Sequence, residues 1–271
     1  MPELPETETI ARDLDRVLLG ARIGGASITR ADVLRGTTSA GFIRRVTGAI
    51  VAAVWRRAKV VVLNLDSGDR IAVQPRFTGS LLIDATPGDP YAAVILSLSD
   101  GRTLTYRDVR RLGTVALLSP DAWAAVDAGL GPEPLDPALS ASSFHGLLAR
   151  SRQPIKVRLM DQRTVAGIGN IYATEALWHA GIDPSRPAQS LSAAEGVTLL
   201  ASLREILTES IAARGTTFRD YRDPFGGRGG YAARLQAYGR AGEPCGRCGR
   251  TLTGTSAIDG RMTVFCAWCQ R

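Results

Sequence analysis

The four cysteines of this 271-residue chain all lie in its last 27 residues, with the spacing C-x2-C-x17-C-x2-C. Two close pairs of thiolates supply the four ligands of a tetrahedral Zn²⁺ ion and leave no open position for a catalytic water. The pattern therefore predicts a small zinc ribbon that holds one structural zinc ion through Cys245, Cys248, Cys266 and Cys269. A redox or disulfide pair is the alternative, which the expected reducing compartment disfavours.

Composition and hydropathy indicate an ordinary soluble globular protein. Apolar residues make up 45% of the chain and charged residues 22%, and the length suits one or two domains with a real core. No apolar run reaches the length of a membrane span. The N-terminal segment MPELPETETIARDL is acidic and lacks the apolar centre of a secretory signal. We therefore expect a cytoplasmic protein with no membrane partner.

The net charge of +7 is concentrated at the C-terminal end of the chain. Residues 1–213 carry 23 basic and 22 acidic side chains, whereas residues 214–271 carry 10 arginines and 4 acids. A basic end on a nearly neutral body favours a polyanionic partner, most often a nucleic acid, although a basic surface without a partner is equally compatible. Only two of the 33 basic residues are lysines, Lys59 and Lys156.

The hydrophobic pattern changes its period between successive parts of the chain. Residues 5–19 have apolar side chains at helical spacing, and Gly20 follows them. Residues 22–118 read as β-strands joined by short turns, as in an antiparallel sandwich or barrel. The Pro-rich segment 130–137 is the expected domain boundary. Beyond it we expect helices at 142–150, 155–163, 171–180 and 191–213, then a mobile loop at 215–230 and a β-hairpin ribbon.

A glycine-containing turn precedes one of the expected helices. Gly167 and Gly169 flank Ile168, and Asn170 is placed to cap a helix that starts at Ile171. Such a turn exposes backbone N–H groups at the positive end of the helix dipole, where a phosphate can bind. For this motif alone, a plain helix–helix turn is the commoner interpretation.

The N-terminus offers a candidate nucleophile. If Met1 is removed, Pro2 presents a secondary amine, part of which is neutral near pH 7. A neutral secondary amine can attack an electrophilic sugar carbon and form an iminium, with the adjacent Glu3 as acid and base. A chain that keeps Met1 has no such amine, and an ordinary N-terminus is the alternative.

Four segments occur in an order that points to a known family. These are the start PELPE, the segment LMDQRTVAGIGNIYATEAL, the segment LQAYGRAGEPC and the terminal cysteine pattern followed by Gln. Together they resemble formamidopyrimidine-DNA glycosylase, a bacterial repair family for oxidised purines, over nearly the whole chain. The start also differs from PEGPE, with which the related endonuclease VIII group typically begins.

The resemblance implies an α+β multidomain fold. Its parts are an N-terminal catalytic antiparallel β-sandwich domain with an N-terminal helix (1–133), a helical helix–two-turns–helix DNA-binding domain (134–235) and a C-terminal zinc ribbon (236–271). It implies that Pro2 is the nucleophile and Glu3 the general acid/base. Lys59 and Arg261 match residues that contact phosphates at the lesion and complete the implied catalytic set.

Further DNA-binding roles are implied by the same resemblance. Lys156 matches a lysine near the damaged nucleotide, Gly169 and Asn170 belong to the phosphate-binding turn of the helix–two-turns–helix motif, and Tyr238 matches a phosphate-contacting tyrosine. Both lysines of the chain thus fall on lysine positions of the family, which chance placement among 33 basic residues would rarely produce.

The chain departs from the family pattern where side chains enter the duplex. Gln74 stands at a phosphate-contacting histidine, and Phe77 stands at the methionine that fills the gap left by the flipped base. Arg110 matches the arginine that reads the orphaned cytosine, but Leu112 replaces the usual wedge phenylalanine. Because Phe and Leu also serve as wedges, strand insertion is compatible with these changes, and the preference for one damaged base is the property that they leave open.

The implied function is a bifunctional DNA glycosylase and AP lyase of base excision repair. It would remove 8-oxoguanine and formamidopyrimidines from duplex DNA through a Pro2 Schiff base and cleave the strand at abasic sites by β,δ-elimination. We expect a nucleoid-associated monomer. The alternatives are an endonuclease VIII-like enzyme for oxidised pyrimidines, a non-catalytic protein that binds damaged DNA, and a zinc-ribbon RNA binder, which leaves the β-domain unexplained.

Overall fold

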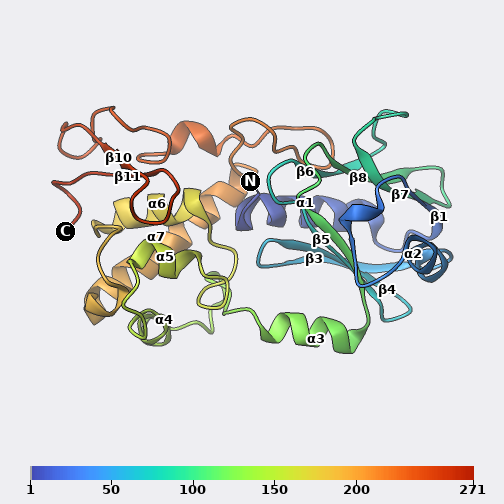
Figure 1. Ribbon diagram of the computed structural model, residues 1–271, viewed down its shortest axis with the longest axis horizontal. Helices are drawn as coiled ribbons and strands as arrows, with labels where there is room; N and C mark the ends of the chain where they lie inside the picture. Colours follow the sequence, from blue (N-terminus) through green and yellow to red (C-terminus); the bar gives the residue numbers. More distant parts are fainter. Residues whose placement is uncertain (1) are drawn as a thin grey trace. The chain divides into compact units, whose positions relative to one another are not determined.

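The computed structural model describes residues 2–271 (Figure 1). The chain divides into two compact units, one made of Met1–Ala128 and Ile211–Ala232 and the other of Gly129–Ser210 and Ala233–Arg271. The predicted boundary at 133/134 lies close to the first crossing, but the segment after the long helix returns to the first unit. Among the residues described, no helix is long and apolar enough to cross a membrane.

The first unit is a sandwich of two sheets, as predicted. One sheet has the order β1 (Ile23–Ile28), β7 (Ala92–Leu98), β8 (Thr103–Asp108), β6 (Gly79–Ile83). The other has the order β2 (Leu34–Arg35), β9 (Thr114–Leu118), β5 (Arg70–Gln74), β4 (Val60–Leu65), β3 (Val51–Arg57). Every pairing is antiparallel except the short β2–β9 pair. The helices of this unit are α1 (Leu4–Leu18), α2 (Ser39–Val46) and α3 (Pro120–Ala128).

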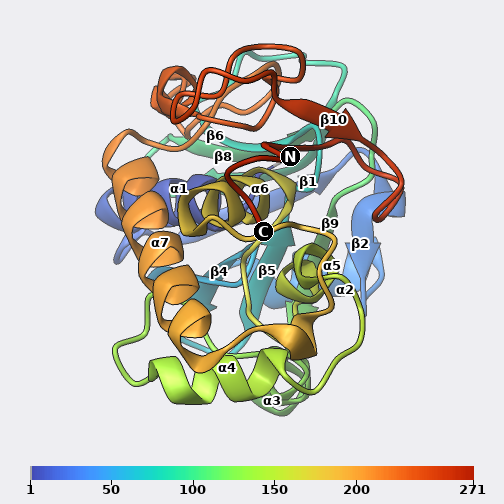
Figure 2. The same ribbon diagram turned by 90° about the vertical axis from the view of Figure 1, so that its left-hand side faces the viewer.

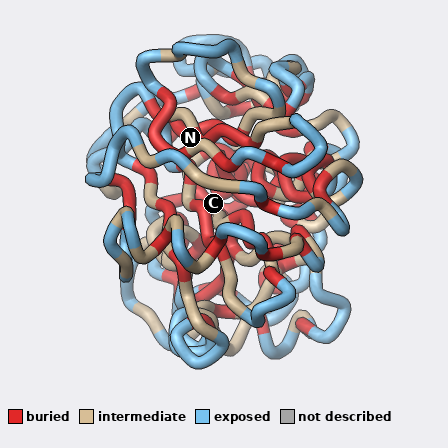
Figure 3. Tube along the Cα trace, turned by 90° about the vertical axis from the view of Figure 1, so that its right-hand side faces the viewer, coloured by how far each residue is buried: buried red, intermediate tan, exposed pale blue. Residues whose placement is uncertain are grey.

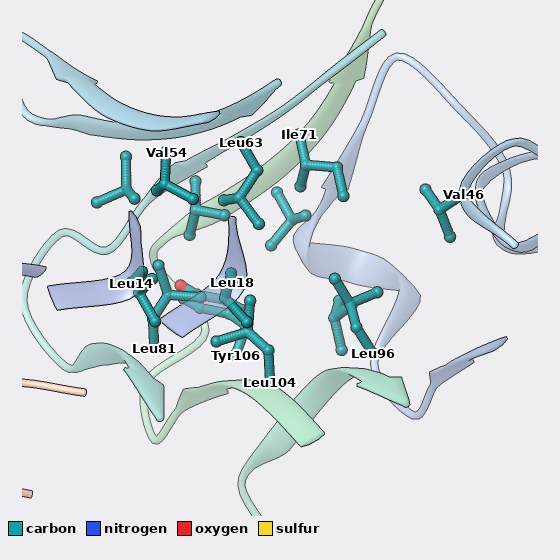
Figure 4. Close-up of a cluster of buried hydrophobic side chains, with 14 of the residues drawn as sticks. Leu14, Leu18, Val46, Val54, Leu63, Ile71, Leu81, Leu96, Leu104 and Tyr106 are labelled. Atoms are coloured by element: carbon teal, nitrogen blue, oxygen red, sulfur yellow. The ribbon is translucent and has the colours of Figure 1, made fainter. Parts of the chain in front are cut away.

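The core of this unit lies between the two sheets and includes one face of α1. Figure 4 shows Leu14 and Leu18 of α1 between Val54 and Leu63 of one sheet and Leu81 of the other. The helical spacing seen in the sequence thus becomes a buried stripe, because residues four apart lie on one helix face. The predicted helix at 5–19 is confirmed to within one residue at each end.

The second unit holds the helices and the ribbon. Its helices are α4 (Ala141–Leu148), α5 (Ile155–Met160), α6 (Asn170–Ala180) and α7 (Ala193–Ala212), whose last residues extend into the first unit. Two short antiparallel strands, β10 (Thr253–Thr255) and β11 (Thr263–Phe265), form the predicted hairpin. Helix α6 packs against both α5 and β11, so it joins the helices to the ribbon (Figure 2).

The segment 215–230 is long but is not uniformly exposed. Figure 3 shows buried and exposed stretches following one another along the chain. Within 215–230, Thr216, Thr217, Tyr221 and Asp223 are buried in the first unit, whereas Phe218 and Phe225 are exposed. The predicted loop is therefore present and is attached to the β-sandwich at several points.

Candidate functional site

The described site residues divide between the two units. The first unit contains Pro2, Glu3, Lys59, Gln74, Phe77, Arg110 and Leu112. The second contains Lys156, Gly169, Asn170, Tyr238, Arg261 and the four cysteines. Each unit therefore gathers one part of the predicted site, and each part has its own local geometry.

Pro2 lies immediately before helix α1, and both it and Glu3 are buried. Glu3 is the N-cap residue, and its side chain accepts the backbone N–H of Glu6 while the Glu6 carboxylate accepts the N–H of Glu3 at 2.8 Å. This reciprocal capping box fixes the direction in which the chain enters the helix. Because the N-terminal end of a helix is electropositive, it would disfavour a positive charge on the Pro2 amine that removal of Met1 exposes.

Glu6 also holds the segment that follows α7. Its other carboxylate oxygen accepts the backbone N–H of Thr216 at 2.7 Å, and the Tyr221 hydroxyl donates to the Glu6 carbonyl at 3.5 Å. A Cβ on Gly215 would lie 2.9 Å from the Glu6 side chain, so only glycine fits there. Sequence reasoning placed Glu6 in the first helical turn but missed this role, since the partner lies 210 residues away.

Arg214 links the same segment to α1 through two acids. Its guanidinium donates to the carboxylate of Asp13 and, at 2.6 Å, to that of Asp223. Burial acts to raise the pKa of Asp223, but hydrogen bonds from Arg214 and from two backbone N–H groups outweigh burial and lower it. Those backbone bonds come from residues within 215–230, so the Asp223 carboxylate organises the loop and ties it to Arg214.

Removing the Asp223 charge is therefore expected to loosen residues 215–230. The change Asp223→Asn keeps the side-chain volume but loses the ion pair with Arg214, and we expect tryptic cleavage at the exposed Arg228 to become about tenfold faster. The matched control is Asp220→Asn in the exposed part of the same loop, which should cleave at the wild-type rate. Equal cleavage of the two variants would contradict this assignment.

The sign of the pH dependence follows from the lowered pKa of Asp223. Its contribution to loop stability is fully present above the ordinary carboxyl pKa of 3.8 and is lost as pH falls through the lower folded value. We therefore expect the wild-type cleavage rate, corrected for protease activity, to be flat above about pH 5. We expect the corrected cleavage rate to rise only at pH values below the ordinary carboxyl pKa. A rise of this rate near pH 7 would exclude the Asp223 carboxyl as the cause.

Lys59 lies in the turn between β3 and β4 and is half-buried. The preceding residue, Ala58, has a positive φ of 53°, which gives the turn its shape. Arg56 donates to the Glu8 carboxylate of α1 at 2.7 Å and to the Ala58 carbonyl at 3.0 Å. This arrangement ties the lysine-bearing turn to the helix that begins after Pro2.

Phe77, Arg110 and Leu112 project from two neighbouring turns of the first unit. Phe77 is 46% exposed and Leu112 is 41% exposed, which is unusual for large apolar side chains. The Arg110 guanidinium lies 5.5 Å from the centre of the Phe77 ring, so these two of the predicted insertion residues come together. Gln74 ends strand β5 beside them and is half-buried.

An open pocket of about 430 Å³ lies beside these turns in the first unit. Its lining combines strand residues with residues of the 215–230 loop: Thr78, Ser80, Leu82, Arg107, Val109, Arg219, Asp220, Arg222 and Gly226. Hydroxyl, guanidinium and carboxylate groups thus surround a space that can accept a polar planar group. The loop that Asp223 and Glu6 hold in place forms one wall of this pocket.

In the second unit, the prediction that Asn170 caps its helix is wrong. Helix α6 begins at Asn170 itself, and Gly169 is the N-cap residue without a side-chain cap. The Asn170 amide instead donates to the Met262 carbonyl at 3.1 Å, because packing of β11 against α6 brings a ribbon carbonyl within reach. Gly167 has a positive φ of 86°, so the predicted glycine turn does require glycine at that position.

Lys156 is completely buried within the second unit. Its ammonium donates to the Asp259 carboxylate at 3.3 Å and to the Thr263 hydroxyl at 2.7 Å. Asp259 also accepts the backbone N–H of Arg261 at 3.1 Å. In this structure the lysine therefore shapes the ribbon turn that presents the exposed Arg261, and its predicted contact with DNA stays a prediction.

Tyr238 is half-buried just before the first cysteine pair. The buried Glu175 carboxylate of α6 accepts the backbone N–H groups of Gln236, Ala237 and Tyr238, at 2.6 to 2.9 Å. Three N–H groups on one carboxylate hold this segment firmly against the helix. The sequence contained no signal for this role, since a glutamate within a helix usually faces solvent.

The four cysteines meet the requirements of a zinc site. Their sulfur atoms all lie within 4.8 Å of one another, and the Cys248 and Cys266 sulfurs are 3.6 Å apart. Tetrahedral Zn–S bonds of about 2.3 Å place sulfurs at nearly that separation. Burial acts to raise the pKa of Cys245, but backbone N–H groups of Arg247 and Cys248 lower it to about 6, whereas burial and the neighbouring thiols raise the pKa of Cys269 to about 12.

Trp178 of α6 completes the surroundings of this cluster. It is 5% exposed and packs with Cys245, Cys266 and the apolar residues of the ribbon. A hydrogen bond from its indole side chain also acts to lower the pKa of the Cys245 thiol. The donor set and its burial both fit a metal held by four thiolates.

Comparison with known proteins gives one consistent result. The family model described as the formamidopyrimidine-DNA glycosylase N-terminal domain matches residues 1–115, and the model for the H2TH domain of the same glycosylase matches residues 130–222. A formamidopyrimidine-DNA glycosylase of Thermomicrobium roseum is 43% identical to this chain, with 100% of this chain and 99% of the relative covered.

Solved structures agree over the whole chain. A mutant of FPG from Lactococcus lactis, in complex with DNA containing Fapy-dG, has a TM-score of 0.93 and 31% identity, with complete coverage of both chains. A MutM protein in complex with DNA containing carbocyclic 8-oxo-G has a TM-score of 0.92 and 32% identity, also with complete coverage of both.

Proposed function

Because this chain belongs to the formamidopyrimidine-DNA glycosylase family, we propose that it excises oxidised purines from duplex DNA and then cleaves the strand as an AP lyase. The substrates are 8-oxoguanine and formamidopyrimidines. The observation that carries the proposal is the position of Pro2, directly before an electropositive helix end and beside the buried carboxylic acids of Glu3 and Glu6.

The nucleophile is the secondary amine that Pro2 presents once Met1 is removed. Its lone pair forms a bond to C1′ of the damaged nucleotide, and the glycosidic bond breaks with its electron pair moving to the base, which takes a proton. The proline nitrogen loses its proton, and the C1′–O4′ bond then breaks as O4′ takes a proton, which leaves the ring-opened deoxyribose as an iminium on the proline nitrogen. Helix α1 favours the neutral amine needed for this attack because its N-terminal dipole opposes an ammonium charge there.

Glu3 handles the proton transfers of this sequence. As the N-cap residue it follows Pro2 directly, so its carboxyl group lies within the reach of groups attached to the proline nitrogen. The iminium then acts as an electron sink. Loss of a C2′ proton expels the 3′ phosphate, and a second elimination expels the 5′ phosphate, which leaves a one-nucleotide gap.

DNA binding is proposed to use both units, each through its own groups. The first unit supplies Lys59 for phosphate and Phe77, Arg110 and Leu112 for insertion into the duplex. The second supplies Arg261, Tyr238 and the Gly169–Asn170 turn for phosphates. The related structures with Fapy-dG and 8-oxo-G DNA support a duplex carrying a damaged purine as the ligand.

The flipped base is proposed to enter the pocket beside Thr78 and Arg222. Hydroxyl and guanidinium groups can bind the carbonyl and N–H edges of an oxidised purine, and the loop 215–230 covers it.

Zinc has no catalytic part in this scheme. When bound by the four cysteines it supplies structural cross-linking of the ribbon, so that Arg261 is presented from a folded turn.

The substrate assignment is tested by borohydride trapping on three duplexes. Purified protein lacking Met1 is incubated with 8-oxoguanine opposite C, with an oxidised pyrimidine, or with an abasic site. We expect covalent adducts on 8-oxoguanine and on the abasic site. An adduct on the oxidised pyrimidine in preference to the purine would support the endonuclease VIII-like alternative, which the departures at Gln74, Phe77 and Leu112 keep open. No adduct on any duplex would favour a non-catalytic binding protein.

A further inference from the structure

Asp108 is a buried acid in the first unit that the proposed chemistry does not use. It is 1% exposed and ends strand β8. One carboxylate oxygen accepts the Thr78 hydroxyl at 2.5 Å and the backbone N–H of Arg110 at 3.2 Å. The other accepts the backbone N–H of Gly113 at 2.8 Å and the Tyr106 hydroxyl at 3.0 Å. An ionised carboxylate has about four acceptor positions, so its capacity is fully used.

Three of these four donors come from the two turns that carry the proposed insertion residues, and the fourth, Tyr106, lies in strand β8 itself. Thr78 follows Phe77 directly, while Arg110 and Gly113 enclose Leu112. The Thr78 hydroxyl also accepts the backbone N–H of Arg110, at 3.1 Å, so the turns are joined directly as well as through the acid. One carboxylate therefore bonds to both turns at once.

Two glycines allow the turns to come this close. A Cβ on Gly113 would lie 2.0 Å from the Tyr106 hydroxyl and 2.6 Å from the Gln74 carbonyl. A Cβ on Gly79 would lie 2.7 Å from the same hydroxyl and 2.3 Å from the Pro75 carbonyl. The Tyr106 hydroxyl thus fills the space between the turns, and no side chain can be added there without moving backbone.

The tips of both turns have unfavourable backbone conformations. Arg76, before Phe77, has a φ of 53°, and Arg111, before Leu112, has a φ of 52°. Residues other than glycine keep such angles only where the surrounding structure holds them. The hydrogen bonds to Asp108 supply such restraint at the base of each turn.

We propose that Asp108 is a positioning residue that couples the two turns, so that Phe77 and the Arg110–Leu112 pair enter the duplex as one rigid wedge. This inference rests on the proposed function, because it assumes that these side chains insert. Arg110 and Phe77 already contact each other within the wedge. Because the two turns are coupled, they are already ordered relative to each other before insertion. The conformational entropy lost in the insertion step is therefore smaller.

The test uses Asp108→Asn in the otherwise complete, Met1-processed, zinc-loaded protein. An amide offers one acceptor oxygen, and its NH2 group cannot accept from the N–H of Gly113 or Arg110. Insertion is followed by the fluorescence of 2-aminopurine placed opposite a tetrahydrofuran abasic analogue, which cannot react with Pro2. We expect the insertion rate to fall about tenfold or more.

Two further variants separate positioning from simple loss of stability. Thr78→Val removes one of the bridging hydroxyls without changing side-chain size, and it should also slow insertion. Asp84→Asn is the matched control, because Asp84 accepts the backbone N–H of Thr103 at 2.8 Å at the other end of the β6–β8 pair. It should insert at the wild-type rate. Thermal unfolding of each variant shows whether the fold is retained.

A second readout separates this inference from the proposed function. We expect kcat/KM for base excision to fall with the insertion rate in Asp108→Asn, while single-turnover trapping on saturating abasic DNA stays within about twofold. Wild-type insertion rates in folded Asp108→Asn and Thr78→Val would overturn the coupling role alone. Equal slowing in Asp84→Asn would overturn it too. Absence of trapping in the wild-type protein would instead overturn the proposed function.

Discussion

Replacing Pro2 by glycine is expected to abolish borohydride trapping on abasic and 8-oxoguanine duplexes, with a loss on the order of 10³-fold or more. A secondary amine forms an iminium that is permanently cationic, whereas glycine gives an imine that must first be protonated to accept electrons. Glycine also lacks the ring that restricts the chain before α1. Adduct formation is measured on denaturing gels after single-turnover reaction.

Binding is expected to survive this change, because phosphate contacts carry most of the affinity and do not involve Pro2. The matched control is Pro5→Gly, which removes a proline from the first turn of α1 but leaves the terminal amine intact and should still be trapped. A second comparison adds one residue before Pro2, which turns its amine into an amide and should eliminate trapping completely. Normal trapping in Pro2→Gly and in the extended chain would sink the nucleophile assignment.

Replacing Cys266 by serine is expected to have the second large effect, because it removes a buried ligand of the predicted zinc site. The ribbon has only two three-residue strands and a small apolar cluster around the cysteines, so its folding depends on the metal. Loss of zinc should disorder the turn that carries Arg261 and release the Met262 carbonyl from Asn170. We expect affinity for abasic-analogue DNA to fall about 100-fold at fixed salt.

Zinc content is measured by mass spectrometry and DNA affinity by fluorescence anisotropy, with salt held constant. Trp268→Phe is the control, since Trp268 lies between Cys266 and Cys269 in the chain but is 52% exposed. This variant should keep both its zinc content and its affinity for DNA. The first unit should retain its β-sheet circular dichroism in both variants. Full zinc content and wild-type affinity in Cys266→Ser would contradict a structural metal site.

Several parts of this protein could be predicted because they depend on residues near one another in the chain. The apolar spacing of residues 5–19 is sufficient for α1, and the alternating strands before residue 118 are sufficient for a sandwich. The spacing of the paired cysteines predicts that their sulfurs gather at one site. Each pair lies within one short turn, and a tetrahedral metal requires all four sulfurs to face one centre. The family resemblance added roles for residues such as Pro2, and these rest on the resemblance rather than on pattern.

The cap of α6 shows where local reasoning fails. Asn170 is a good capping residue by type, but a ribbon carbonyl 92 residues away offers its amide a better partner, and the helix starts one residue earlier than predicted. For Lys156, the folded chain shows a buried position beside Asp259 that the sequence does not give, while its predicted contact with DNA stays a prediction. Neither partner can be identified from the residues that surround these positions in the chain.

Local chemistry thus accounts for the helix after Pro2, the strands and the two close cysteine pairs, because short-range sterics and periodicity act within a few residues. Folding alone brings Glu6 to Thr216, Arg214 to Asp13 and Asp108 to Thr78. A buried carboxylate must have its acceptor positions filled, but many donors along a chain can fill them. Which donors do so is determined only when the sheets and loops have packed.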